Sequence, residues 1–219
     1  MTSADETVVD VIGRVLRPLV PALVPHSTLY GLAPTVGAAR PGELDVWSLY
    51  TLLNNVAAAL TLFTGKVAPK IIDDLRRALL VETSPRPTRV KVLVASDADV
   101  LLVSGEVQRL TKPFFGKSDV VRLATASSEL ARNIYMYAKK GEVNLQLAEA
   151  LRWVTFEITA KDAGPGIPDI ALILSGNYKS ATGLGRGLVG TKSLLDSLEI
   201  SSVMGVGTTA RGAKRTRLL

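Results

Sequence analysis

The sequence predicts an α+β protein in two parts, a small helical domain followed by a larger domain that combines a sheet with helices. Three observations predict this organisation. Apolar residues recur at helical spacing in the first part, the proline-containing segment ETSPRPT follows at 82–88, and β-prone runs with glycine-rich turns appear only beyond it. We therefore expect one domain over residues 1–85 and a second over residues 86–219.

The composition excludes several classes of function. The chain of 219 residues has no cysteine and a single histidine, His26, so disulfide chemistry, a histidine-based metal site and a Ser-His-Asp triad are not expected. The net charge of +6 favours anionic partners. The basic residues at 211, 214, 215 and 217 have no aromatic residues between them, so we expect an exposed strand or tail and no nucleic-acid binding.

Helices are expected throughout the first domain. The first carries apolar residues at helical spacing, namely Val8, Ile12, Val15, Leu16 and Leu19. Prolines at 18, 21 and 25 then interrupt it. Asp45 is the expected N-cap of a long helix that stops at Gly65, and Pro69 is expected to open another.

The segment 46–65 contains no charged residue and is long enough to span a bilayer. Asn54 and Asn55 lie at its centre, so we expect a buried or dimer-forming helix rather than a membrane span. Because its apolar surface exceeds what short helices readily cover, we expect the first domain to dimerise or to dock a partner. Residues 1–10 carry acids and no basic residue, unlike a signal peptide, and we expect a cytoplasmic protein.

The second domain is expected to be a layered sheet with helices on one face. Residues 89–95 alternate like a strand, and helices capped by Asp97 and Ser118 are expected to follow. The remaining expected elements are a strand at 152–160, a helix at 188–198, a strand from 199 to 203, and a last strand from Thr208 toward Leu218.

The first cluster that carries chemistry is Glu129 and Asn133 in SSELARN. A spacing of four residues places both on one helical face, beside the apolar stripe. A carboxylate there can accept a proton from a hydroxyl, and an amide oxygen suits Mg²⁺, which prefers oxygen ligands. Taken alone, such a pair is more often part of a solvated helix surface.

The second cluster is DAGPGI at 162–167, directly after a β-prone run. Asp162 at a strand end can accept a hydrogen bond from an exocyclic amine such as that of adenine. Gly164 and Gly166 allow the backbone to come close to a planar ligand. An ordinary Gly-Pro turn explains this hexapeptide equally well.

The third cluster is GLGRGLVG at 183–190, which leads into a helix. Glycines ahead of a helix N-terminus expose amide donors toward phosphate, and Arg186, Lys179 and Lys192 add positive charge. The pattern is neither the Rossmann fingerprint, since no strand directly precedes it, nor the P-loop pattern GxxxxGK[ST].

In this order the clusters resemble the motifs of the GHKL, or Bergerat-fold, ATPases, and GVGT at 205–208 is similar to that family's closing box. The stretches RLATASSELARNIYMYAKKGEV, KDAGPGIPDI and GLGRGLVGTKSLLD are similar to the RsbT-type switch-protein kinases of bacterial stress signalling. The resemblance covers residues 90–217 and leaves the helical domain unexplained. It implies a Bergerat-type α/β sandwich, in which a mixed sheet is covered by helices on one face.

The resemblance also implies residue roles. Glu129 would be the general base, Asn133 the Mg²⁺ ligand, and Asp162 the residue that binds the adenine amine. The other nucleotide-binding residues implied are Gly164, Gly166 and Ile167 in the acid–glycine turn, Gly183, Leu184, Gly185, Arg186, Gly187 and Leu188 in the phosphate lid, and Thr208 near the adenine. Lys179 and Val189 replace a small hydroxyl residue and a proline of that branch, and both bear on closure of the lid.

By resemblance the function is Mg²⁺-dependent phosphoryl transfer from ATP to a serine or threonine of a STAS-domain partner, in a stress or sigma-factor switch. The alternative is a nucleotide-gated switch that holds or releases a phosphatase or sigma factor without transferring phosphate. A histidine-kinase fragment is disfavoured, because His26 lies between Pro25 and Ser27 and lacks the phospho-acceptor motif.

Overall fold

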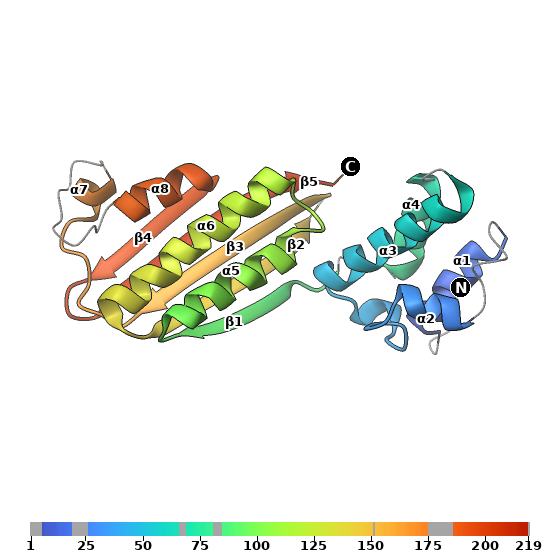
Figure 1. Ribbon diagram of the computed structural model, residues 1–219, viewed down its shortest axis with the longest axis horizontal. Coiled ribbons are helices and arrows are strands. Elements are labelled where there is room, and N and C mark those ends of the chain that lie inside the picture. Colours follow the sequence, from blue (N-terminus) through green and yellow to red (C-terminus); the bar gives the residue numbers. More distant parts are fainter. Residues whose placement is uncertain are drawn as a thin grey trace. The chain divides into compact units, whose positions relative to one another are not determined.

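The computed structural model describes residues 6–18, 26–65, 69–80, 85–150, 152–174 and 186–218. The chain forms two compact units, residues 1–88 and 89–219. The described part of the first unit is helical, whereas the second contains a five-stranded sheet with helices (Figure 1). The α+β class expected from the sequence is therefore confirmed.

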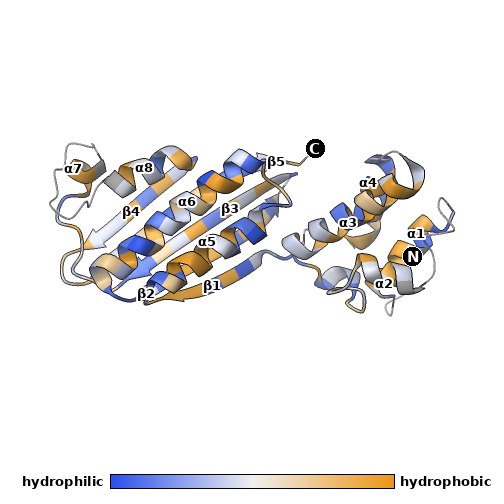
Figure 2. Cartoon of the chain, in the orientation of Figure 1, coloured by the Kyte–Doolittle hydropathy of each residue, from blue (hydrophilic) through white to orange (hydrophobic). Residues whose placement is uncertain are grey.

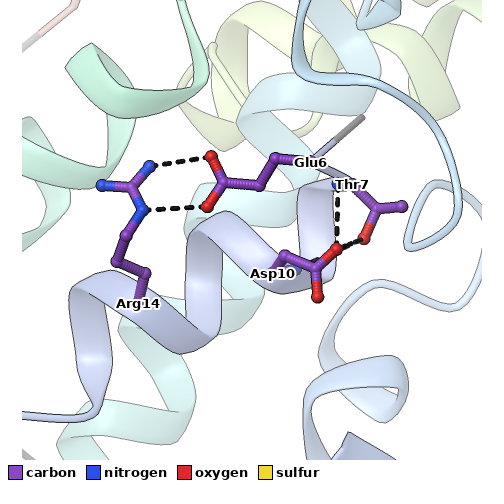
Figure 3. A network of polar contacts seen from close by, with 4 residues as sticks. All are labelled: Glu6, Thr7, Asp10 and Arg14. Atoms are coloured by element: carbon purple, nitrogen blue, oxygen red, sulfur yellow. Dashed lines mark hydrogen bonds and ion pairs between the residues drawn. The ribbon is translucent and has the colours of Figure 1, made fainter. Parts of the chain in front are cut away.

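The helices of the first unit are α1 (Val8–Leu16), α2 (His26–Leu32), a 3-10 turn (Pro41–Glu43), α3 (Val46–Thr64) and α4 (Pro69–Leu79). α1 starts with a capping box, shown in Figure 3. The Asp10 carboxylate accepts a hydrogen bond from Thr7 N at 3.0 Å, and the Thr7 hydroxyl accepts one from Asp10 N at 3.4 Å. Arg14 donates to both oxygens of Glu6. The box satisfies amides that the start of a helix leaves unpaired.

α3 has the boundaries that the sequence predicts. Asp45 Oδ1 accepts a hydrogen bond from Ser48 N at 2.8 Å, and the helix stops at Gly65, whose φ is 72°. By length and composition α3 could cross a membrane, yet its buried residues belong to the core of the unit. Those core residues include Leu49, Leu52, Leu53, Val56 and Leu60. At its C-terminal end, Leu62 and Phe63 are exposed.

The second unit is built on a sheet of order β1-β2-β3-β5-β4. Its strands are β1 (Thr88–Val94), β2 (Gly141–Ala150), β3 (Trp153–Asp162), β4 (Ser197–Val203) and β5 (Gly207–Arg217). β3 pairs antiparallel with β2 and β5, and β4 pairs antiparallel with β5. These registers place Asp162, the last residue of β3, near the turn that joins β4 to β5.

Helices cover one face of this sheet. They are α5 (Asp97–Thr111), α6 (Lys117–Asn133) with a π-helical extension (Ile134–Ala138), and α8 (Arg186–Leu194). The short helix α7 (Ile170–Leu174) packs against α8. α5 and α6 lie side by side, and α8 packs against α6 (Figure 1). Alternate residues of β3, from Val154 to Ala160, are buried under them. Figure 2 shows hydrophilic and hydrophobic residues alternating along α6, as expected for a helix with one buried side.

Two predicted helix caps are wrong. α5 is capped by Ser96 and not by Asp97: the Ser96 hydroxyl accepts a hydrogen bond from Asp99 N at 3.3 Å, and Asp99 Oδ2 accepts one from Ala95 N at 2.9 Å. These reciprocal bonds favour the earlier start. α6 begins at Lys117, so Ser118 is inside the helix, and its N-cap Gly116 offers no side chain.

Several elements also differ from the sequence prediction. β2 was not expected, although Val143, Leu145 and Leu147 alternate as in a strand with one buried face. The short helices α2 and α7 were not expected either. α8 ends at Leu194 rather than at 198, because Asp196 N already donates to Ala213 O of β5 at 2.9 Å and β4 begins at Ser197.

Candidate nucleotide site

A pocket opens where the C-terminal end of α6 meets the end of β3. Its walls come from α6 and its π-helical extension, β3, the turn after β3, α8, and the facing parts of β4 and β5. The lining residues are Leu130, Asn133, Ile134, Tyr137, Ala160, Asp162, Pro165, Gly166, Ile167, Leu188, Ile200, Thr208 and Ala210. Asp162 is the one residue in this lining that carries a formal charge. The pocket therefore has an apolar wall with few polar groups, as is usual for small-molecule sites.

Two backbone amides hold the carboxylate of Asp162 in place. Its Oδ1 accepts hydrogen bonds from Gly164 N at 2.8 Å and from Thr208 N at 3.2 Å. These donors come from the turn after β3 and from β5, so the side chain is fixed from two directions. With Oδ1 engaged, Oδ2 is the oxygen left to accept a hydrogen bond from a ligand amine.

Ser202 supports the wall of the pocket, and sequence reasoning missed it. Its hydroxyl oxygen accepts a hydrogen bond from Ile167 N at 2.8 Å and lies 3.0 Å from Gly207 O and 2.8 Å from Thr208 Oγ1. Gly205 N also donates to Pro165 O at 2.9 Å. The turn after β3 is therefore joined to the β4–β5 turn, which fixes one wall of the pocket. No sequence motif pointed to Ser202.

The glycines of the acid–glycine turn lie so close to neighbouring atoms that a side chain would not fit at these positions. A Cβ on Gly164 would lie 2.6 Å from Ala138 Cβ, and one on Gly166 would lie 2.5 Å from Val203 O. Gly166 also has a φ of +80°, which side-chain-bearing residues rarely adopt. Gly207, at φ +136°, has no room for a Cβ beside the Asp162 carbonyl oxygen. These contacts pack the turn against the π-helical extension and the β4–β5 turn.

Asn133 lies at the junction between α6 and its π-helical extension and lines the pocket. Its Nδ2 is shielded from solvent and has no hydrogen-bond partner among the described residues. A buried amide with an unmet hydrogen bond is unusual in a folded protein. This feature fits a site that a polar ligand completes.

Glu129 lies one helical turn before Asn133 and is not part of the pocket lining. Its carboxylate faces the first turn of α8, because a Cβ built on Gly187 would lie 2.7 Å from Glu129 Oε2. The adjacent Leu188 is 4% exposed and lines the pocket. Glu129 therefore sits beside the pocket at the point where α6 and α8 touch.

Comparison with known proteins identifies the family. No protein-family model matches the chain. Over 103 residues the chain is 43% identical to the serine/threonine-protein kinase RsbT of Bacillus subtilis (strain 168), a match that covers 47% of this chain and 77% of RsbT. The chain belongs to the RsbT family. The resemblance inferred from the three motifs is thereby confirmed.

A solved structure also matches this RsbT-family chain. It contains the RsbU and RsbW domains of Rv1364c from Mycobacterium tuberculosis, with a TM-score of 0.42 and 17% sequence identity over 74% of this chain. The match spans 47% of the length of that solved chain.

The RsbT-family motifs are brought together as far as the described residues extend. Asn133, Asp162, Gly166, Ile167, Leu188 and Thr208 line one pocket, Gly164 N donates to Asp162, and the Glu129 carboxylate faces Gly187 beside the pocket. Gly183, Leu184, Gly185 and Lys179 lie outside the described residues, as does the side chain of Arg186. Among the residues described, no group of three or more His, Asp or Glu side chains is placed to hold a metal ion.

Proposed function

We propose that this RsbT-family chain is a protein kinase that transfers the γ-phosphoryl group of ATP to a serine or threonine of a STAS-domain partner. The reaction would belong to a bacterial stress or sigma-factor switch. Family membership supports the chemistry. The main structural support for nucleotide binding is the Asp162 carboxylate, which two backbone amides hold in a pocket that Asn133 also lines.

ATP binding would begin with adenine. Asp162 Oδ2 accepts a hydrogen bond from the exocyclic amine, and Thr208 lies beside it on the same wall. Ile134, Ile167 and Leu188 supply apolar surface for the flat ring. The glycines of segment 183–187 would then wrap the phosphates, as the family motif implies.

Asn133 is the residue we assign to Mg²⁺. Its amide oxygen is a ligand type that this cation accepts. Because the described residues provide no other cluster of metal ligands, phosphate oxygens and water would complete the shell. When bound, Mg²⁺ would offset negative charge on the phosphates during transfer.

Glu129 is the proposed general base. It accepts the proton of the acceptor hydroxyl while that oxygen forms a bond to the γ-phosphorus and the bond to the β–γ bridging oxygen breaks, which releases ADP. Its position one turn from Asn133 suits this role, since the hydroxyl and the phosphate must meet between base and metal.

The test is phosphate incorporation into a purified STAS-domain protein of the same organism, with labelled ATP. We expect acid-stable phosphate on serine or threonine. Glu129→Gln should reduce the rate by about 10²-fold or more, the usual contribution of a general base. Glu199→Gln, on an exposed residue of β4, is the matched control. Asp162→Asn should weaken ATP binding. Transfer that is absent, or that survives Glu129→Gln unchanged, would refute the proposal.

One observation favours a second function, an ATP-gated switch that binds or releases a phosphatase or sigma factor. The Glu129 carboxylate faces Gly187 in the first turn of α8. Phosphates that bind there would repel this carboxylate, and either Glu129 or α8 would shift in response. Partner binding measured with and without ATP in Glu129→Gln separates the functions. Binding that responds to ATP after transfer is lost supports the switch.

We propose that the first unit mediates homodimerisation, in a cytoplasmic protein. Leu62 and Phe63, at 85% and 59% exposure, leave apolar surface at the C-terminal end of α3. Light scattering should give a dimer mass for the full chain and a monomer mass for Phe63→Ser. A monomeric wild-type chain would contradict this proposal.

A further inference from the structure

The five-stranded sheet has one face that the helices do not cover. α5, α6 and α8 lie on the other face (Figure 1), and Val154, Phe156 and Ile158 of β3 are fully buried beneath them. Successive side chains of a strand point to opposite faces, so the residues between these three point outward. The nucleotide pocket lies on the helix side, because Ala160 and Ala210, which belong to the buried series, line it. A partner on the outward face would therefore leave the pocket open to nucleotide.

Three arginines of β5 lie on this outward face beside an aromatic ring. Arg217 pairs with Trp153 of β3 in the antiparallel register, and Arg215 and Arg211 lie two and six residues before it on the same side of the strand. All four residues are exposed. Among the residues that the structure describes, no carboxylate forms an ion pair with any of the three guanidinium groups. We call these four residues the basic face.

Lys214, in the same strand, already has its partners within the fold. It pairs with the buried Phe156 and lies on the helix side of β5, where its ammonium is 3.1 Å from Asp196 and 3.6 Å from Asp119. Its side chain is 15% exposed. The sequence places this lysine in one basic run with the arginines, yet the alternation of the strand separates them. The lysine charge is neutralised inside the unit, and the arginine charges remain for a partner.

The Arg215 guanidinium is held by stacking. It lies over the Trp153 ring, 4.9 Å from the ring centroid, a contact between two strands that no local sequence pattern indicates. Stacking on an aromatic ring orients the flat guanidinium and leaves the N–H groups along its edge available as donors. A carboxylate fits this edge with two parallel hydrogen bonds. Arg215 is therefore prepared to receive a carboxylate.

The spacing of the arginines suits an extended ligand. Side chains two residues apart on a strand are separated by about 7 Å, so Arg215 and Arg217 offer two donor groups at that distance, and Arg211 lies about 14 Å from Arg215. Acidic side chains at alternate positions of an extended segment repeat at the same distance. A segment with alternating Asp or Glu can therefore place a carboxylate on each arginine.

Two carboxylates on the same face favour a protein over a nucleic acid. Glu157 pairs with Ala213, between Arg211 and Arg215, and Glu199 pairs with Arg211 on the opposite flank. They would repel a continuous chain of phosphates, whereas the separate carboxylates of a protein segment can avoid them. The aromatic ring of the basic face already stacks on a guanidinium instead of offering that face to a base. A second copy of the chain is disfavoured, because a two-fold interface would oppose like charges.

We infer that the basic face docks an extended acidic segment of a partner protein, with carboxylates at alternate positions bound by Arg215 and Arg217. This partner binds on the side of the sheet opposite to the nucleotide pocket, so it can stay bound while nucleotide enters. The inference rests on charge and strand geometry and does not depend on the kinase proposal.

The experiment titrates the full chain with a blocked peptide of eight residues in which glutamate and threonine alternate. The indole N–H signal of Trp153 is followed in proton–nitrogen correlation spectra, and Trp153→Phe identifies that signal. We expect a saturable shift, and weaker binding as salt is added, because exposed charges are screened. The same peptide with glutamine in place of glutamate should cause no shift. A peptide with its four glutamates in one block should bind more weakly, because the repeat no longer matches the arginines.

Matched variants separate the basic face from net charge. Arg215→Gln combined with Arg217→Gln should weaken binding of the alternating peptide by about tenfold or more, since two charge-assisted contacts are lost. Arg122→Gln combined with Lys117→Gln lowers the net charge by the same amount on exposed positions of α6 and should change the affinity by less than about twofold.

Three results would overturn the inference. A Trp153 signal that does not shift would show that the peptide does not bind the basic face. Equal losses in the two double variants would mean that net charge alone attracts the peptide. Tighter binding of a thymidine pentanucleotide, which also carries four negative charges, would assign the face to nucleic acid.

Discussion

Replacing Gly187 with alanine should disturb catalysis without disturbing nucleotide binding. The new methyl group would lie 2.7 Å from Glu129 Oε2, and 3.4 Å is the near limit of ordinary contact. The obstructed group is the end of a side chain, so the carboxylate would move by roughly 0.7 Å while α8 stays in place. The alanine keeps its backbone amide, and any contact of that amide with phosphate would persist.

The magnitude follows from the role proposed for Glu129. A displacement of 1 Å can cost about 10²-fold in rate. We therefore expect Gly187→Ala to slow phosphoryl transfer by about ten- to a hundredfold and to change ATP affinity by less than about threefold. Alanine is also a better helix former than glycine, so the fold should not suffer.

The matched control is Gly190→Ala, one turn further along α8. A Cβ there would meet no atom within 4 Å, so transfer should continue at the wild-type rate, with a gain in stability of about 0.5–1 kcal/mol. The assays are initial rates of transfer to the partner, ATP titration and thermal unfolding. If Gly187→Ala transferred phosphate as fast as Gly190→Ala, the assignment of Glu129 as a base held by α8 would be wrong.

Two further predictions concern residues that support the site. Ser202→Ala removes the acceptor of Ile167 N and should weaken ATP binding by roughly three- to tenfold, whereas Ser201→Ala on the exposed face of β4 should have no effect in the same titration. Burial would raise the pKa of Asp196, but hydrogen bonds from Arg215 N and the Lys214 ammonium outweigh it and hold that pKa below its ordinary value. Because folding lowers the pKa of Asp196, its ionised carboxylate stabilises the fold at pH values above the pKa of the unfolded chain. This stabilisation is lost as the pH falls through the pKa of the folded chain. Wild type and Asp196→Asn should therefore differ in unfolding free energy at neutral pH and converge below about pH 4. A constant difference across that range would contradict this assignment.

The elements that the sequence predicted well are those whose signals are local. Asp45 and Gly65 end α3 because a side-chain cap and a left-handed glycine act within one turn of their own position. β2 was missed although its apolar residues alternate, because Glu142, Asn144 and Gln146 weaken its strand propensity. Pairing with β3 along its whole length compensates, and only the assembled sheet supplies that pairing.

In the candidate site, too, local sequence predicted some features, and others depend on contacts between distant segments. Local motifs identified Asp162 and Asn133, and both residues line the pocket. The sequence left open whether the acid–glycine hexapeptide is an ordinary turn, and its residues alone could not decide. The hydrogen bond from Thr208 N, which lies 46 positions away in the chain, shows that β5 also holds the Asp162 carboxylate, and no local pattern could have revealed this contact. The role of this turn in binding adenine stays a prediction.

Ser202 could not have been found from sequence because its role depends on strand register. It lies opposite Thr208 in the β4–β5 pairing, and the turn from Val203 to Gly207 sets that alignment. A shift of one residue would turn the hydroxyl to the other face of the sheet and leave Ile167 N without its acceptor. The wall of the pocket therefore depends on the register between β4 and β5. Substitutions in the turn between these strands should lower the affinity for the nucleotide before they lower the stability of the fold.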